Sequence, residues 1–136
     1  MSRIMAIDYG QKRVGLAVTD PMQIIASPLD TVETKRIFDY LKNYLQKEQV
    51  EKIIIGMPYR ADGSLPPWAQ QIKDFAGKIK EMFPGIEIEF YDERYTSKMA
   101  QQALVQGGFK KKDRRKKENL DKISATIMLQ EYLGII

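Results

Sequence analysis

Two residue types are missing from this chain of 136 residues, which contains no cysteine and no histidine. Without cysteine the protein can form neither disulfide bonds nor thiolate metal sites, which favours the cytoplasm as its compartment. Without histidine it lacks the imidazole group, a common general base and a usual zinc ligand. Any chemistry must therefore depend on carboxylates, hydroxyls, lysine or arginine, and such ligands suit a hard cation such as Mg²⁺.

Long hydrophobic runs are missing as well. No apolar stretch approaches the roughly 20 residues that a membrane-spanning helix needs, and the first residues lack the pattern of a signal peptide. Hydrophobic residues make up 43% of the chain and charged residues 29%, which is typical of an ordinary globular protein. We expect a single domain over residues 1–136 and no association with membranes.

The net charge of +4 is unevenly distributed along the chain. Residues 110–117, KKKDRRKK, hold seven of the 22 basic residues and one acid, so the rest of the chain carries a net charge of −2. A mildly acidic body with one cationic segment predicts a partner with a phosphate backbone. The alternative is a solvated basic loop without a partner.

Hydrophobic periodicity and turn residues predict five strands and four helices. KIIIG is an all-apolar run of the kind that is buried on both faces of a sheet, and IEIEFY alternates as an edge strand does. We expect strands at about residues 3–8, 13–19, 23–32, 52–56 and 86–91, and helices at about 34–48, 67–83, 96–106 and 118–133.

Three strands in a meander followed by two strand–helix units predict a mixed α/β sheet. With right-handed crossovers and the fourth strand beside the first, the strand order is 3-2-1-4-5, with strand 2 antiparallel. Ligands of open α/β sheets bind at the carboxyl ends of strands where the connections change direction. In this order, that position is the end of the first strand.

Acidic residues follow the strands at this edge of the sheet. Asp8 ends the first strand, and Asp92 and Glu93 end the fifth. Asp121 lies in the first turn of the last helix, and the small residues Ser124 and Ala125 one turn later would let that helix approach the sheet closely. We therefore expect Asp8, Glu93 and Asp121 to converge, with Asp92 as a possible fourth member. Carboxylates that close together raise one another's pKa unless a cation neutralises them.

Each acid alone also has an ordinary structural explanation. Asp8 could cap the turn beside Gly10, Glu93 could pair with Arg94, and Asp121 could favour the helix dipole. Three acids directed at one sheet edge make these separate explanations weaker in combination.

Four segments resemble one known family over essentially the full length of the chain. They are IDYGQKRVGLAVTD, IIIGMPYRADGS, YDERYTS and DKISATIMLQEYL. In this order and spacing they resemble the YqgF/RuvX family, a branch of the ribonuclease H-like superfamily that is related to the Holliday-junction resolvase RuvC. The resemblance implies a ribonuclease H-like sheet flanked by helices, and a bacterial cytoplasmic nuclease that matures the 5′ end of precursor 16S ribosomal RNA.

The resemblance also implies roles for individual residues. The family's acidic positions fall on Asp8, Glu93 and Asp121. Our hypothesis is that they hold two Mg²⁺ or Mn²⁺ ions about 3.5–4 Å apart, with Asp8 bridging the ions. Gly10 would let the backbone approach the scissile phosphate, and basic or hydroxyl side chains would hold neighbouring phosphates. These substrate-binding candidates are Lys12, Arg13, Arg94, Thr96, Lys111, Lys112, Arg114 and Arg115.

Other functions compete with this hypothesis. A resolvase-like endonuclease would act on branched DNA instead of precursor rRNA. A non-catalytic RNA-binding assembly factor would keep the basic segment but would not need three acids in one place. Actin-like sugar kinases share an Asp-x-Gly hairpin, but they need a second domain and another glycine-rich loop, for which 136 residues are too few. The sequence leaves both a monomer and a homodimer open.

Overall fold

The computed structural model describes residues 1–93 and 117–135, and in the second segment it describes side chains from Ile123 onward. The helix expected near residues 96–106 lies outside the described residues. The described elements are, in chain order, β1 (Arg3–Tyr9), β2 (Arg13–Thr19), β3 (Ala26–Glu33), the 3₁₀ turn η1 (Thr34–Arg36), α1 (Ile37–Lys47), β4 (Val50–Met57), α2 (Ala69–Met82), β5 (Glu87–Asp92) and α5 (Lys117–Leu133).

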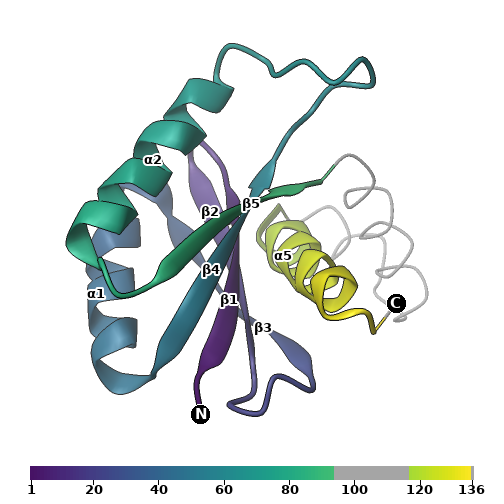
Figure 1. Cartoon of the computed structure of the whole chain (residues 1–136). Helices are drawn as coiled ribbons and strands as arrows, with labels where there is room; N and C mark the ends of the chain where they lie inside the picture. The colour runs from purple at the N-terminus through teal and green to yellow at the C-terminus, as the bar shows by residue number, and fades with distance from the viewer. Residues whose placement is uncertain (94–116, 136) are drawn as a thin grey trace.

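The strands form one mixed sheet in the order β3-β2-β1-β4-β5 (Figure 1). β2 is antiparallel to β1 and β3, whereas β4 runs parallel to β1 and β5. This arrangement confirms the predicted strand order and the edge position of β5. In β4, burial runs unbroken from Ile53 to Met57, as an apolar strand with neighbours on both sides requires.

Helices cover both faces of the sheet (Figure 1). On one face, α1 and α2 bury a cluster that includes Met5, Ile7 and Phe75. On the other face, α5 packs through Ala125 against Ala6 and other small strand residues. Because these side chains are small, α5 lies close to the strands, as the sequence predicted for this helix.

Two helices begin later than expected. The segment predicted as one helix over residues 34–48 starts with the 3₁₀ turn η1, and α1 begins at Ile37. The reason is that Thr34 bonds outward to the β1–β2 turn, donating its N–H to the Lys12 carbonyl at 3.0 Å and its hydroxyl to the Gly10 carbonyl at 2.6 Å. The helix expected from Pro67 begins at Ala69, after a turn in which the Pro66 carbonyl accepts the Ala69 N–H.

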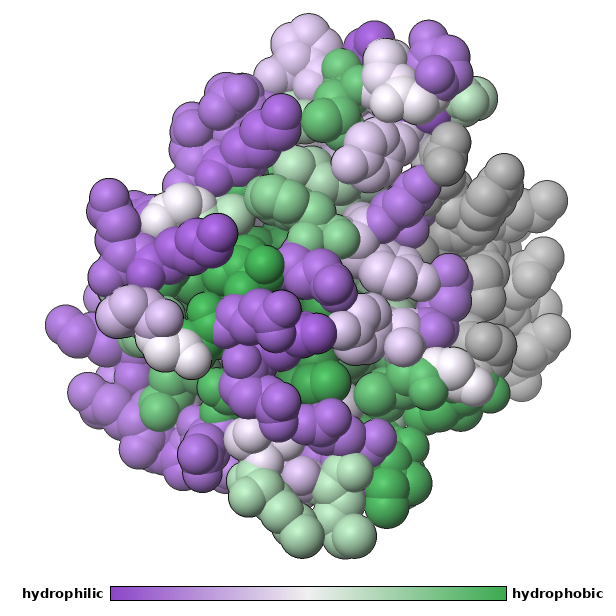
Figure 2. All heavy atoms as spheres, in the orientation of Figure 1, coloured by the Kyte–Doolittle hydropathy of each residue, from purple (hydrophilic) through white to green (hydrophobic). Residues whose placement is uncertain are grey.

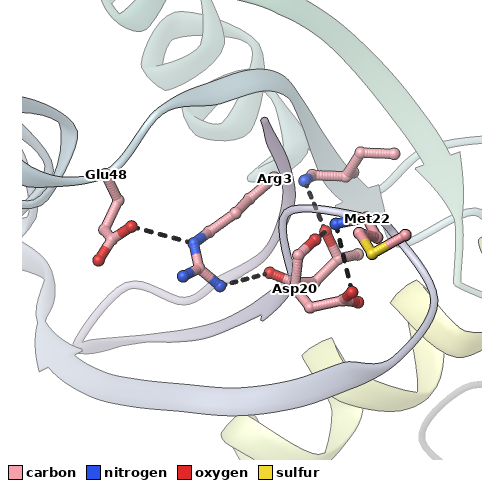
Figure 3. Close-up of polar contacts among 6 residues, drawn as sticks. Arg3, Asp20, Met22 and Glu48 are labelled. Carbon is pink, nitrogen blue, oxygen red and sulfur yellow. Dashed lines mark hydrogen bonds and ion pairs between the residues drawn. The ribbon is translucent and has the colours of Figure 1, made fainter. Parts of the chain in front are cut away.

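The loop between β2 and β3 is organised by the carboxylate of Asp20. It accepts hydrogen bonds from the backbone N–H group of Met22 at 3.2 Å (Figure 3) and from those of Ile24 at 2.7 Å and Ile25 at 2.8 Å. Bonds of this kind favour the charged form, so the N–H of Ile25 above all, followed by that of Ile24, holds the pKa of Asp20 below its ordinary value. This loop is why β3 begins at Ala26 and not near residue 23, where we expected it.

Arg3 supports the same end of the sheet. Its guanidinium donates to Glu48 at 3.2 Å and to the Thr19 carbonyl at 2.9 Å (Figure 3). At the end of the sheet where β1 begins, the charged side chains of Arg3 and Asp20 therefore have hydrogen-bond partners within the fold.

The surface differs between regions of the molecule. Figure 2 shows mainly hydrophilic residues over α1 and α2. Large apolar side chains are exposed at the amino terminus and in the β2–β3 loop, where Met1, Ile24 and Ile25 are more than half exposed. Within the described part of the chain, no helix has both the length and the apolar character needed to cross a bilayer.

Candidate active site

Asp8 lies near the end of β1 and on the face of the sheet that α5 covers. Successive side chains of a strand point to opposite faces. Ala6 belongs to the cluster packed against α5, and Tyr9 packs against the cluster on the other face. This alternation places Asp8 beneath α5, in line with Ala6.

Glycines flank Asp8 on both neighbouring strands. Asp8 pairs with Gly15 of β2. On the other side, β1 and β4 pair Ile7 with Ile55, and one further step in this parallel register places Asp8 beside Gly56. Paired residues point to the same face, so neither neighbouring strand places a side chain beside Asp8 in its row. The strands leave room around the carboxylate.

Glu93 fills part of this room. Its N–H donates to the Met57 carbonyl at 3.2 Å, which extends the β4–β5 pairing beyond the end of β5. A Cβ atom at Gly56 would overlap the Glu93 Oε2 atom, and the same Cβ would lie 3.4 Å from the Met128 Cε of α5. The carboxyl group of Glu93 therefore lies over Gly56, on the same face as Asp8 and one strand away.

The pKa of Glu93 is strongly perturbed. Burial of the carboxyl group, followed by repulsion from Asp92, raises the pKa of Glu93 from 4.5 to about 7. A bound cation would lower the pKa of Glu93 again, because a nearby opposite charge favours the charged form of a carboxyl group. The oxygen ligands of Glu93 and Asp8 are of the type that Mg²⁺ and Mn²⁺ prefer.

Asp92 occupies a different position from its neighbour. It is exposed, and strand alternation places it on the face opposite Tyr91, which packs toward α5. The structure thus brings Asp8 and Glu93 together and directs Asp92 away from them, although the charge of Asp92 still acts on Glu93.

Asp121 lies in α5, seven residues before Met128, which is about two helical turns. Its side chain is outside the described part of the structure, so its role as a third ligand stays a prediction. Among the described side chains, no group of three or more acids comes together as a metal site.

The β1–β2 turn holds three of the predicted substrate contacts. At Gly10, a Cβ atom would lie 2.5 Å from the Arg13 carbonyl oxygen, so the tight turn itself requires glycine at this position. Lys12 is exposed and Arg13 is partly buried. The other predicted contacts lie outside the described residues: Arg94, Thr96, Lys111, Lys112, Arg114 and Arg115.

Sequence reasoning missed the two flanking glycines, Gly15 and Gly56. A glycine inside an apolar strand often marks a place where another group approaches the backbone closely, and both residues carried that signal. Recognising their shared role needed the strand register, which puts them in one row with Asp8.

Comparisons with known proteins agree on one family. A family model described as "RuvX: Holliday junction resolvase" matches residues 2–134. Proteins named "Putative pre-16S rRNA nuclease" are similar to the chain. One from Amoebophilus asiaticus is 55% identical over 98% of this chain and 95% of its own length. Another from Phocaeicola vulgatus is 50% identical over 98% of this chain and 96% of its own length.

Solved structures support the fold. The chain is similar to Thermus thermophilus RuvC in complex with a Holliday junction substrate, with a TM-score of 0.59 and 16% identity over 98% of this chain and 97% of that one. This likeness confirms the expected ribonuclease H-like fold, with its mixed sheet in the order 3-2-1-4-5.

Proposed function

The chain belongs to the RuvX family of Holliday junction resolvases, and we propose that it is a divalent-metal-dependent nuclease that matures the 5′ end of precursor 16S rRNA. The names of its relatives support RNA as the substrate. Ribosome assembly would place a single-domain nuclease of this kind in the cytoplasm.

One observation carries the proposal. Asp8 lies beside Gly56 in the sheet register, the carboxyl group of Glu93 lies over Gly56 on the same face, and burial has raised the pKa of Glu93 to about 7. Glu93 is buried here without an ion pair to any described cation. Such an arrangement is costly for a purely structural role, and it suits a site that holds Mg²⁺ or Mn²⁺.

We assign the following roles to the residues. Asp8, Glu93 and Asp121 would hold the divalent cations. When bound, such cations would activate a water and stabilise the leaving oxygen of an in-line attack on phosphorus. The Gly10 turn brings the backbone close to the substrate strand, and Lys12 and Arg13 hold its phosphates. Arg94 and the basic segment 110–117 add contacts of the same kind.

Asp8→Asn tests the proposal. The variant removes one negative charge and no core contact, so it should fold and bind nucleic acid while losing metal-dependent cleavage. The assay uses a precursor RNA that spans the 5′ end of 16S rRNA, with Mg²⁺ or with EDTA. Asp74→Asn on α2 is the matched control and should cleave like the wild type. Wild-type cleavage by Asp8→Asn would refute the assigned site.

A second substrate is favoured by one observation, the likeness to RuvC bound to a Holliday junction. A four-way DNA junction in the same assay separates the two substrates. Cleavage of the junction and not of the RNA would move the function to branched DNA. Metal-independent RNA binding without cleavage of either substrate would make the protein an assembly factor.

A further inference from the structure

A hollow lies between the β1–β2 turn and η1, at the end of the sheet where β1 stops. Its volume is about 490 Å³, and it opens to solvent. The residues that line it come from the turn and from the junction of β3 with η1: Gln11, Lys12, Arg13, Glu33 and Lys35.

The two walls of this hollow are fixed to each other. Thr34 donates its N–H to the Lys12 carbonyl at 3.0 Å and its hydroxyl to the Gly10 carbonyl at 2.6 Å. At the base of the turn, Arg13 pairs with Glu33 in the β2–β3 ladder. The backbone therefore holds the turn and η1, which carry these cations, next to each other before any ligand binds.

The hollow carries a surplus of positive charge. Lys12, Arg13 and Lys35 line it, and Arg36 follows directly along the chain. The one acid, Glu33, pairs with Lys35 at 3.4 Å and with Arg36 at 4.0 Å. The side chains of Lys35 and Arg36 are 74% and 71% exposed, and that of Glu33 is 56% exposed. Exposed pairs of this kind are weak, so a ligand phosphate can displace Glu33 easily.

We propose that this hollow binds a backbone phosphate of the substrate strand, and that Lys35 and Arg36 are binding residues in addition to Lys12 and Arg13. In the free protein Glu33 forms ion pairs with Lys35 and Arg36, so its carboxylate competes with the phosphate for these two side chains. This inference rests on the proposed function, because it takes the bound polynucleotide to be the substrate.

A polynucleotide fits the position better than a free phosphate ion. The turn begins two residues after Asp8, so a strand whose scissile bond lies at Asp8 continues toward the hollow. The hollow is also open and wide, whereas a site for one free anion encloses its ligand with converging donors.

The proposal can be tested by measuring the binding of a single-stranded RNA oligomer. Fluorescence anisotropy reports the binding at several salt concentrations, and EDTA prevents metal-dependent cleavage during the measurement. The double variant Lys35→Gln/Arg36→Gln should bind about 5- to 10-fold more weakly. Its slope of log K against log salt should flatten by about 0.7 for each phosphate that the variant no longer neutralises. The matched control is Lys42→Gln/Lys47→Gln, which removes the same charge farther along α1 and should change both quantities much less.

Glu33→Gln gives the opposite test. Removal of a competing carboxylate should tighten RNA binding about 2- to 5-fold, which a structural role of its ion pairs would not produce. An unchanged salt slope in the Lys35/Arg36 variant, or weaker binding by Glu33→Gln, would overturn the proposal. Loss of inorganic-phosphate binding in the Lys35/Arg36 variant with RNA binding unchanged would also overturn it, because the hollow would then be a free-anion site.

Failure of this inference can be distinguished from failure of the proposed function. At RNA concentrations below saturation and with Mg²⁺, the Lys35/Arg36 variant should cleave more slowly than the wild type in proportion to its weaker binding, since it changes binding and not the carboxylates. A wild type that cleaves while the variant binds normally would refute the hollow alone. If the variants differ from the wild type in RNA binding as expected but the wild type never cleaves RNA, only the proposed nuclease activity is refuted.

Discussion

Asp20 and Glu93 are carboxyl groups at opposite ends of one sheet, and the protein treats them in opposite ways. Asp20 accepts three backbone N–H groups, and these hold its pKa below the ordinary value. Glu93 is buried over Gly56 beside other acids, and its pKa rises to about 7. Asp20 is a group that the fold itself satisfies, and it stabilises a loop. Glu93 is a buried acid with no ion pair to a described cation, which supports our proposal that its end of the sheet is the functional one.

The largest expected effect is on cleavage. Glu93→Gln keeps the shape of the side chain and removes its charge, so it should reduce metal-dependent cleavage by at least about 100-fold. Loss of a group that only orients a metal ligand already costs 10- to 100-fold. Asp20→Asn should leave the cleavage rate unchanged at a temperature where it is folded. Equal cleavage rates for Glu93→Gln and the wild type would show that the end of the sheet with Glu93 is no more important for activity than the end with Asp20.

The next effect is on the pH dependence of stability. Because the folded-state pKa of Glu93 is raised, the unfolded chain loses this proton first, near pH 4.5, and the metal-free protein becomes less stable as the pH rises toward about 7. The loss should reach up to about 3 kcal/mol. Urea unfolding in EDTA from pH 5 to pH 8 measures it, and Glu93→Gln should flatten the decline. A wild type that gains stability across this range would contradict the burial of an uncompensated acid.

Asp20 should have the opposite pH dependence. Its folded-state pKa lies below the ordinary value of 3.8, so its stabilising effect is complete above that value and disappears as the pH falls below it. Thermal unfolding between pH 5 and pH 2.5 should show this loss in the wild type and a smaller loss in Asp20→Asn. An identical acid profile would show that the N–H bonds of the β2–β3 loop contribute nothing.

The smallest expected effect on stability is that of a substitution at Gly56. Gly56→Ala places a methyl group where the Glu93 carboxyl lies, so Glu93 must move away. Melting temperature in EDTA should change by only a few degrees, because the displaced acid gains access to water, while cleavage falls sharply. Gly77→Ala is the control, since its added Cβ meets nothing within 4 Å. Full activity in Gly56→Ala would show that the position of Glu93 is unimportant.

The sequence predicted more of the sheet than of the site. Apolar runs and turn residues were enough to give the strand order, because burial and alternation are properties of consecutive residues. The late start of β3 depends on Asp20 bonding to residues up to five positions away, a competition that strand propensity does not describe. In the same way, Thr34 delays α1 by bonding to a turn more than 20 residues earlier.

The candidate acids were also found from sequence, since the ends of parallel strands meet at one edge. Sequence alone did not show which of these acids share a face of the sheet. The strand register was needed to show that Glu93 faces α5 with Asp8 and that Asp92 does not. The raised pKa of Glu93 depends on burial by Gly56 and α5 together, and no single segment contains that information.

The ionisation of Glu93 with and without metal distinguishes a cation site from an acid with only a structural role. Carbon-13 NMR of the glutamate carboxyl groups can follow it, with Glu93→Gln to assign the resonance. We expect a pKa of about 7 for Glu93 in EDTA and a pKa below the ordinary value of 4.5 at saturating Mg²⁺. The same raised pKa in both conditions would contradict a cation site at this end of the sheet.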